Sequence, residues 1–251
     1  MPALPMNALP LNHPAHDRLT AFFWRDDALR SRGVSGRLLA GNLAVPAPPA
    51  RVRADWEREI RTRLCLEPGD VEQMPLPRTR ARWPELALCE EAMRDWTRAL
   101  GLGEVLADSD MALMACRGAR YHHDGGQYGG AAFCNLFLCE DKGLDVHFPG
   151  TGDRIALTPG AAMIFDTCQP HAVIPRDATG FDEADFASGP DRTLLFLSWE
   201  LPIEDARVAR ALGIEFDVDP AAASRLDEEQ LWADGARVGV DPASGQWVRT
   251  G

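Results

Sequence analysis

The sequence reads YHHDGG at positions 121–126 and QPHAVIPR at positions 169–176, and these two stretches indicate both a fold and a site. Side chains of an extended strand alternate between its two faces, so His122 and Asp124 project to the same side. A more distant His171, which stands beside β-forming residues, can complete a set of two imidazoles and one carboxylate. The two stretches therefore predict a metal site that is carried by β-strands.

The chemistry of these three side chains favours iron. Two histidines and one carboxylate cover one face of an octahedral ion and leave the opposite positions open, which is the ligand set of non-haem Fe(II) oxygenases. The open positions allow a co-substrate and dioxygen to bind. We therefore expect His122, Asp124 and His171 to be both the metal ligands and the catalytic residues.

Two other histidines are weaker candidates. His123 should point away from the metal, because it lies between His122 and Asp124 on a strand. In the alternating run 144–148 the apolar residues share one face, which leaves His147 on the other. If that other face lines the interior, His147 competes as a ligand or contacts substrate; otherwise it is a surface or supporting residue.

The middle of the chain predicts a mainly β fold. Short apolar runs between residues 106 and 201 are separated by Gly, Pro, Asp and Asn, as in a sandwich or jelly roll. The runs are Met111 to Cys116, Ala132 to Leu138, Leu144 to Phe148, Ile155 to Leu157, Ala161 to Phe165, Ala172 to Ile174 and Leu194 to Trp199.

The two ends of the chain have a different texture, so three regions are expected within one compact domain. Residues 1–105 form a helical support region, with helices predicted over 15–40 around Leu19, Phe22, Phe23 and Trp24, over 52–64 and over 84–100. Residues 106–201 form the catalytic core. Residues 202–251 form an extension with a helix over 203–212 and a terminal hairpin over 231–248.

Composition excludes several partners. The net charge of −12 argues against binding nucleic acid, which relies on clustered Lys and Arg. No apolar run reaches about 20 residues, the length of a membrane-spanning helix. Residues 1–14 lack the basic and apolar parts of a secretory signal. The six cysteines show neither a CxxC pair nor the spacing of a disulfide scaffold, so a cytoplasmic location is expected.

An ordered series of motifs extends the two opening stretches and carries a family resemblance. The series is Tyr121 to Gly126, Gly143 to Pro149, Leu157 to Asp166, His171 to Pro175 and Arg192 to Trp199. In this order it resembles the core of the 2-oxoglutarate- and Fe(II)-dependent dioxygenase superfamily, in texture the prolyl-hydroxylase-like branch. The resemblance covers residues 110–200. It implies a double-stranded β-helix, the jelly-roll or cupin-like fold, supported by the N-terminal helices.

The resemblance also assigns roles to individual residues. His122, Asp124 and His171 would bind Fe(II), and Arg192, which heads the last apolar run, would bind the distal carboxylate of 2-oxoglutarate. A planar guanidinium suits that role because it forms a two-point, charge-assisted pair with a carboxylate. Arg176 is the alternative arginine. Asn135 and Tyr121 are candidates to help hold the co-substrate.

The activity implied by the resemblance is hydroxylation of an unactivated C–H bond with dioxygen, which releases succinate and carbon dioxide. Asp124 favours hydroxylation over halogenation, because a carboxylate fills the position that halogenating relatives leave for chloride. The expected substrate is a small molecule, such as an amino acid or other metabolite, or else a protein side chain. Two alternatives remain: a cupin-like metalloenzyme that does not use 2-oxoglutarate, and a non-catalytic jelly-roll module that binds a ligand.

Overall fold

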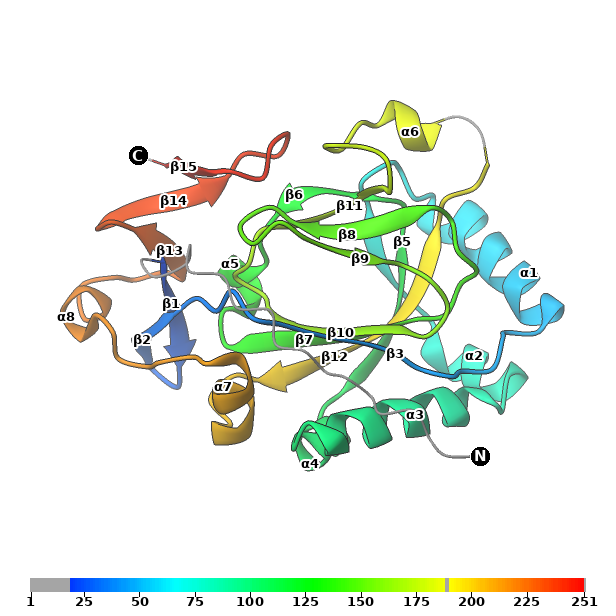
Figure 1. The fold of residues 1–251 in the computed structure, drawn as a ribbon, viewed down its shortest axis with the longest axis horizontal. Helices are drawn as coiled ribbons and strands as arrows, with labels where there is room; N and C mark the ends of the chain where they lie inside the picture. Colours follow the sequence, from blue (N-terminus) through cyan, green and yellow to red (C-terminus); the bar gives the residue numbers. More distant parts are fainter. Residues whose placement is uncertain (1–18, 188–189, 251) are drawn as a thin grey trace.

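The computed structural model of the chain describes residues 19–187 and 190–250. These residues form three antiparallel sheets with helices packed around them (Figure 1). The strands are β1 (Leu19–Arg25), β2 (Ala28–Gly33), β3 (Leu38–Asn42), β4 (Val71–Met74), β5 (Met111–Cys116), β6 (Ala119–His122), β7 (Ala131–Phe137), β8 (Leu144–Phe148), β9 (Asp153–Ala156), β10 (Ala161–Asp166), β11 (His171–Pro175), β12 (Leu194–Pro202), β13 (Gln230–Ala233), β14 (Ala236–Val240) and β15 (Trp247–Arg249). The α-helices are α1 (Ala50–Glu59), α2 (Leu76–Arg82), α3 (Leu86–Ala99), α4 (Gly103–Ala107), α5 (Gly125–Tyr128), α6 (Ala184–Ala187), α7 (Ala206–Leu212) and α8 (Pro220–Ala223), and a π-helical turn, Ile60–Leu64, follows α1.

The central strands form the predicted double-stranded β-helix. Strands β5, β12, β7 and β10 lie in a six-stranded sheet, which β3 and β4 complete at its two edges. Strands β6, β11, β8 and β9 form the facing four-stranded sheet. All seven apolar runs of the sequence correspond to strands, and the fold class is confirmed. The eighth strand of the core, β6, has the sequence ARYH and shows no apolar run.

The six-stranded sheet is buried on both faces, because successive side chains alternate between two cores. On its outer face Leu113, Leu136 and Leu197 pack with the helices in the larger hydrophobic cluster. On its inner face Phe137 and Phe196 pack toward the smaller sheet in a second cluster. The inner cluster surrounds the interior of the β-helix, where the predicted metal ligands lie.

The helices α1 and α3 cover the outer face of the large sheet, as their amphipathic patterns predict. Trp56 of α1 and Trp96 of α3 are both buried in the larger cluster. The expected helices over 52–64 and 84–100 are therefore confirmed. The helix expected over 203–212 is also present as α7. Among the described residues, no helix has both the length and the apolar character needed to cross a bilayer.

The helix expected over 15–40 is wrong within the described residues. Residues 19–33 form the hairpin β1–β2, which turns at Asp26 with a φ of 52°, and β3 follows. Strand β1 pairs with β13 near the other end of the chain, and the predicted terminal hairpin is present as β13, β14 and β15. Figure 1 shows these blue and orange-red strands side by side. This pairing between distant segments determines the structure of β1, and a local apolar pattern cannot reveal it.

Candidate metal centre

Two adjacent strands bring the predicted ligands together. His122 ends β6, Asp124 stands just before α5, and His171 begins β11. Strands β6 and β11 pair so that His122 and His171 lie opposite each other, with ring centroids 4.5 Å apart. A site shared by residues far apart in the sequence therefore follows from one antiparallel pairing.

The possible ligand atoms of these three residues converge. The carboxylate of Asp124 lies 3.6 Å from Nε2 of His122 and 3.5 Å from Nε2 of His171. One potential ligand atom from each residue lies within 4.8 Å of the others, so a single ion can contact all three. Within the described ranges this is the one group of His, Cys, Asp and Glu side chains that meets this criterion.

Backbone carbonyls orient both imidazole rings. Nδ1 of His122 donates to the carbonyl oxygen of Arg120 at 2.7 Å, and Nδ1 of His171 donates to that of Gln169 at 3.0 Å. A carbonyl can only accept, so in the neutral rings the proton is on Nδ1 and the Nε2 lone pair is directed at the site. Fixing the second ring nitrogen in this way is usual for metal-binding histidines.

The electrostatics of the site favour a bound cation. Burial, together with His122, lowers the pKa of His171 to about 3, so its imidazole stays neutral and able to bind metal. Burial also raises the pKa of Asp124, an effect that His122 and His123 partly offset. A buried carboxylate is stabilised in its charged form by a nearby positive ion. The neutral imidazole of His171 and the carboxylate of Asp124 therefore suit a divalent metal.

The turn between β10 and β11 supports two of the ligands. The carbonyl oxygen of Thr167 accepts the backbone N–H of Asp124 at 2.8 Å. The hydroxyl of Thr167 donates to the carbonyls of Tyr128 and Ala131, at 2.6 and 2.9 Å. Because Gln169 of the same turn orients His171, this turn positions both Asp124 and His171.

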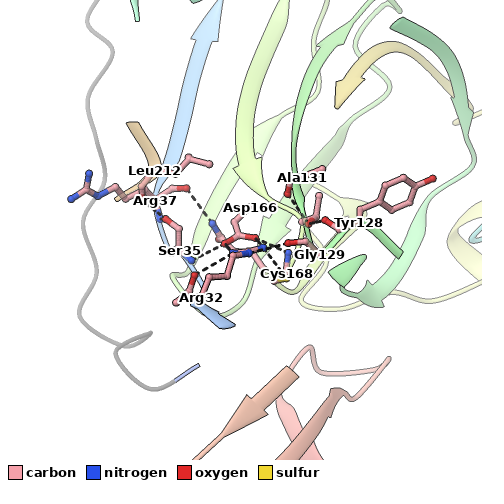
Figure 2. A network of polar contacts seen from close by, with 12 residues as sticks. Arg32, Ser35, Arg37, Tyr128, Gly129, Ala131, Asp166, Cys168 and Leu212 are labelled. Atoms are coloured by element: carbon pink, nitrogen blue, oxygen red, sulfur yellow. Dashed lines mark hydrogen bonds and ion pairs between the residues drawn. The ribbon is translucent and has the colours of Figure 1, made fainter. Parts of the chain in front are cut away.

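An arginine from the N-terminal hairpin anchors this turn (Figure 2). Arg32 of β2 donates to both carboxylate oxygens of Asp166, at 2.7 and 2.8 Å, and neither side chain is exposed. Arg32 also donates to the carbonyl of Gly129 at 2.9 Å. Cys168 lies against this pair, with Sγ 3.1 Å from Nη2 of Arg32. Sequence reasoning missed Arg32, because nothing near it in the sequence marks its partner.

A cavity of about 470 Å³ opens beside the three ligands, which form part of its wall. Its apolar wall comes largely from the inner face of the two sheets and includes Met111, Met114, Phe133, Phe137, Val146 and Phe196. Its polar wall includes Gln73, Asp110, Gln127, Asn135, Ser198 and Glu200. A volume of this size can hold a small ligand. Of these polar residues only Asn135 was predicted. Ser198 and Glu200 could have been found, because they lie two and four residues after Phe196 on the same strand and so share its face.

The two candidate arginines have different surroundings. Arg176 is paired with Asp141 and Asp145. Arg192 stands two residues before β12, and its buried Nη1 has no hydrogen-bond partner among the described residues. Arg192 is not part of the cavity wall. Leu194, two residues later, pairs with Cys116, and Cys116 lines the cavity. Along the chain Arg192 thus lies close to the residue that reaches the Cys116 end of the cavity, and among the described residues its buried Nη1 is a donor without an acceptor, which a carboxylate would supply.

The two residues expected beside Arg192 also differ. Asn135 lies in the cavity wall, and its buried Oδ1 has no partner among residues 19–187 and 190–250. Tyr121 lies on the other face of β6 from His122, where its hydroxyl contacts Nδ1 of His147 at 2.6 Å. The expectation that Tyr121 holds a co-substrate does not agree with this placement, because the strand alternation directs it away from the cavity.

The two other histidines of the described residues, His123 and His147, point away from the proposed metal ligands. Val146 of β8 lines the cavity, so its neighbour His147 faces the opposite side with Tyr121 and does not compete as a ligand. His123 packs against Trp247 of β15, with ring centroids 5.7 Å apart, and its Nδ1 accepts the N–H of Gly125 at 3.2 Å. The prediction that His123 points away is confirmed.

Comparison with known proteins finds similarity only to solved structures. No protein-family model and no curated protein matches the sequence. A prolyl-4-hydroxylase of Pseudomonas putida is 18% identical with a TM-score of 0.37, and the match covers 66% of this chain and 92% of that one. A viral collagen prolyl hydroxylase from Paramecium bursaria Chlorella virus-1, in complex with 2-oxoglutarate, is 12% identical with a TM-score of 0.36 and coverage of 65% and 94%.

A third similar structure is a non-heme alpha-ketoglutarate-dependent epimerase from nogalamycin biosynthesis. It is 15% identical, with a TM-score of 0.31 and coverage of 77% of this chain and 89% of that one. All three similarities are distant, so the function proposed next depends on the residues of the site.

Proposed function

We propose that this protein is an Fe(II)- and 2-oxoglutarate-dependent dioxygenase that hydroxylates an unactivated C–H bond of a small molecule. One observation carries the proposal: the Nε2 atoms of His122 and His171 converge with the carboxylate of Asp124 at the wall of a ligand-sized cavity. Two imidazoles and one carboxylate are the donor set of non-haem Fe(II) oxygenases. The open side of this set faces a space where other molecules can bind.

The residues present fit both groups of the reaction. His122, Asp124 and His171 would hold Fe(II), and Arg192 would bind the distal carboxylate of 2-oxoglutarate with the buried nitrogen that now lacks a partner. When bound, iron and 2-oxoglutarate supply, with dioxygen, the oxidising power for the C–H bond, and succinate and carbon dioxide are released. Asn135 would donate from its amide nitrogen to the same co-substrate.

The protein itself contributes orientation and shielding. The carbonyl oxygens of Arg120 and Gln169 accept from Nδ1 of the two imidazoles and so leave Nε2 of each ring directed at the proposed metal position. The ring of Phe165 lies 4.9 Å from that of His171, and the apolar wall around it limits the water near the reacting atoms. Asp124 would fill a coordination position that halogenating relatives leave for chloride, which favours hydroxylation.

The redox state of the cysteines indicates the kind of compartment in which such an enzyme would work. All six are free thiols. Free thiols persist in a reducing compartment, where ferrous iron also stays reduced. We therefore place the activity in the cytoplasm.

Anaerobic titration of the metal-free protein with Fe(II), followed by 2-oxoglutarate, tests the proposal. A weak visible charge-transfer band is expected when the co-substrate binds the metal. If iron binds but 2-oxoglutarate produces no band, the proposal is wrong and the alternative holds, a cupin-like metalloenzyme that does not use 2-oxoglutarate. If no metal binds, the protein is a ligand-binding jelly roll.

A further inference from the structure

The charged side chains in the cavity wall are all acidic. Asp110 and Glu200 lie in the wall with Asp124, and none of the described residues that line the cavity is Lys or Arg. Asp124 is the proposed metal ligand, so two carboxylates remain without a role. A cavity lined by one sign of charge concentrates ligands of the opposite sign.

The two remaining carboxylates are neighbours at one end of the strands. Met111 of β5 pairs with Trp199 of β12, and Asp110 and Glu200 are the next residues beyond this pair, both in the cavity wall. Neither side chain makes an ion pair or hydrogen bond with another described residue, and both are exposed. They therefore form an unpaired acidic rim at the Met111 end of the cavity, opposite the Cys116 end where Arg192 stands.

Two arginines near the rim share one carboxylate and do not contact the rim itself. On its other side Asp110 lines a smaller hollow that also contains Arg80 and Arg94. Both guanidinium groups lie beside the carboxylate of Glu90, at 3.3 and 3.5 Å. Within the described residues neither arginine forms an ion pair with Asp110 or Glu200, so both carboxylates of the rim are available to a molecule inside the cavity.

A buried amide next to the rim independently requires a hydrogen-bond donor from a ligand. Asn135 is 7% exposed, lines the cavity, and its Oδ1 has no partner among the described residues. It pairs across the strands with Ser198, two residues from Glu200. An unsatisfied buried carbonyl is costly, and 2-oxoglutarate as a dianion carries no donor. A protonated amine can supply one.

The cavity wall between the rim and the metal is apolar. Phe133 pairs across the strands with Glu200, and its ring lies 6.0 Å from that of Phe165, which in turn contacts His171. Met111 and Met114 line the same space. A ligand that follows this wall therefore passes an apolar segment from the acidic rim toward the metal.

From these observations we infer that the substrate is a small amine: a protonated amino or guanidinium group bound by Asp110 and Glu200, joined to an apolar segment whose C–H bonds reach the metal. This inference depends on the proposed function only for the reaction at the metal. The preference for a cation follows from the residues of the cavity wall and does not depend on that function. Asp110 and Glu200 are the residues that determine specificity, and Asn135 accepts a further hydrogen bond from the same amine.

Calorimetry with three probes of matched chain length tests the charge preference. Pentylammonium, pentanol and pentanoate are titrated anaerobically into the protein loaded with Co(II) and 2-oxoglutarate. Pentylammonium should bind most tightly and pentanoate least. Asp110→Asn and Glu200→Gln should each weaken its binding by about fivefold, as expected for one exposed ion pair. Added salt should weaken it as well.

The matched control is Glu72→Gln. Glu72 is an exposed carboxylate on β4 between Val71 and Gln73, which line the cavity, so it faces away and its loss changes only the net charge. Equal binding of the three probes, no binding of pentylammonium, or equal effects of Glu72→Gln and Glu200→Gln would overturn the inference. Failure of the proposed function has a different signature: the visible band with Fe(II) is absent while the preference for pentylammonium persists.

Discussion

Arg32 and Asp166 stand 134 positions apart in the sequence and form a two-point ion pair from which solvent is excluded. The pair joins the N-terminal hairpin to the turn that positions Asp124 and His171. Breaking one partner of a buried pair leaves the other charge without compensation, which is costly. The proposed metal site is therefore coupled to a segment that contributes none of its expected ligands.

Arg32→Met should both destabilise the fold and weaken metal binding. Removing one partner of a buried ion pair typically costs about 3–5 kcal/mol, measurable by urea denaturation. The affinity for Co(II) should fall as well, because the turn that holds Asp124 and His171 loses its anchor. Arg30→Met on the same strand removes partly exposed ion pairs with Asp217 and Glu204 and should leave Co(II) binding unchanged. If Arg32→Met fails to fold, Arg32→Lys provides the test: unchanged Co(II) affinity in the folded variant contradicts the coupling.

Single replacement of the metal ligands should abolish tight metal binding. We expect His171→Ala and Asp124→Ala each to lose the Co(II) absorption spectrum of the site, because only two of the three proposed protein ligands remain in each variant. His147→Ala is the matched control, since that imidazole contacts Tyr121 on the other face of the sheet. Loss of the spectrum in His147→Ala with retention in His171→Ala would reverse the assignment.

The two arginines should differ in their effect on 2-oxoglutarate. Arg192→Ala should raise its dissociation constant by roughly tenfold to a hundredfold, the range for a lost hydrogen bond to a charged group. Arg176→Ala removes contacts with Asp141 and Asp145 and should leave this constant nearly unchanged. The measurement is an anaerobic titration of the metal-loaded protein. A larger effect from Arg176→Ala would assign the co-substrate to the other arginine.

Gly125 is required by close packing behind Asp124. A Cβ atom there would lie 2.6 Å from Sγ of Cys168 and 2.8 Å from Cδ1 of Leu231. Gly125→Ala should therefore cost about 1–3 kcal/mol in unfolding free energy, as overpacking does. Gly126→Ala is the control, because a Cβ there meets nothing within 4 Å. Equal stability of the two variants would show that the packing behind Asp124 adapts without cost.

Thiol labelling should separate Cys65 from the other cysteines. Cys65 is exposed, whereas burial raises the pKa of Cys116 and of Cys168 to about 12. At pH 8 a thiol with such a pKa is ionised in only about one molecule in ten thousand, and the thiolate is the reactive form. A disulfide reagent should therefore modify Cys65 rapidly in the native protein and the buried thiols only after denaturation. Rapid native labelling of Cys168 would contradict its burial against Arg32.

Patterns that are local in the sequence predicted much of the core. The apolar runs between residues 106 and 201 indicated the strands of the β-helix. The shared strand face expected for His122 and Asp124 is wrong in detail, because β6 ends at His122 and Asp124 caps α5, but the two side chains still converge. The four-residue apolar period predicted α1. These features depend on the geometry of a single strand or helix, which neighbouring residues specify.

The tertiary structure decided the features that depend on distant partners. Strand β1 exists because β13 pairs with it, so a pattern around Phe22 could not distinguish strand from helix. The alternation of Tyr121 with His122 was visible in the sequence, but only the facing sheet determines which side is the interior. The position of Arg32 beside Asp166 and of Glu200 beside Asp110 likewise follows from pairing and packing across the fold. The sequence alone therefore determined the types and spacing of the proposed metal ligands, whereas the structure determined what surrounds them, because contacts between distant segments form only when the sheets assemble.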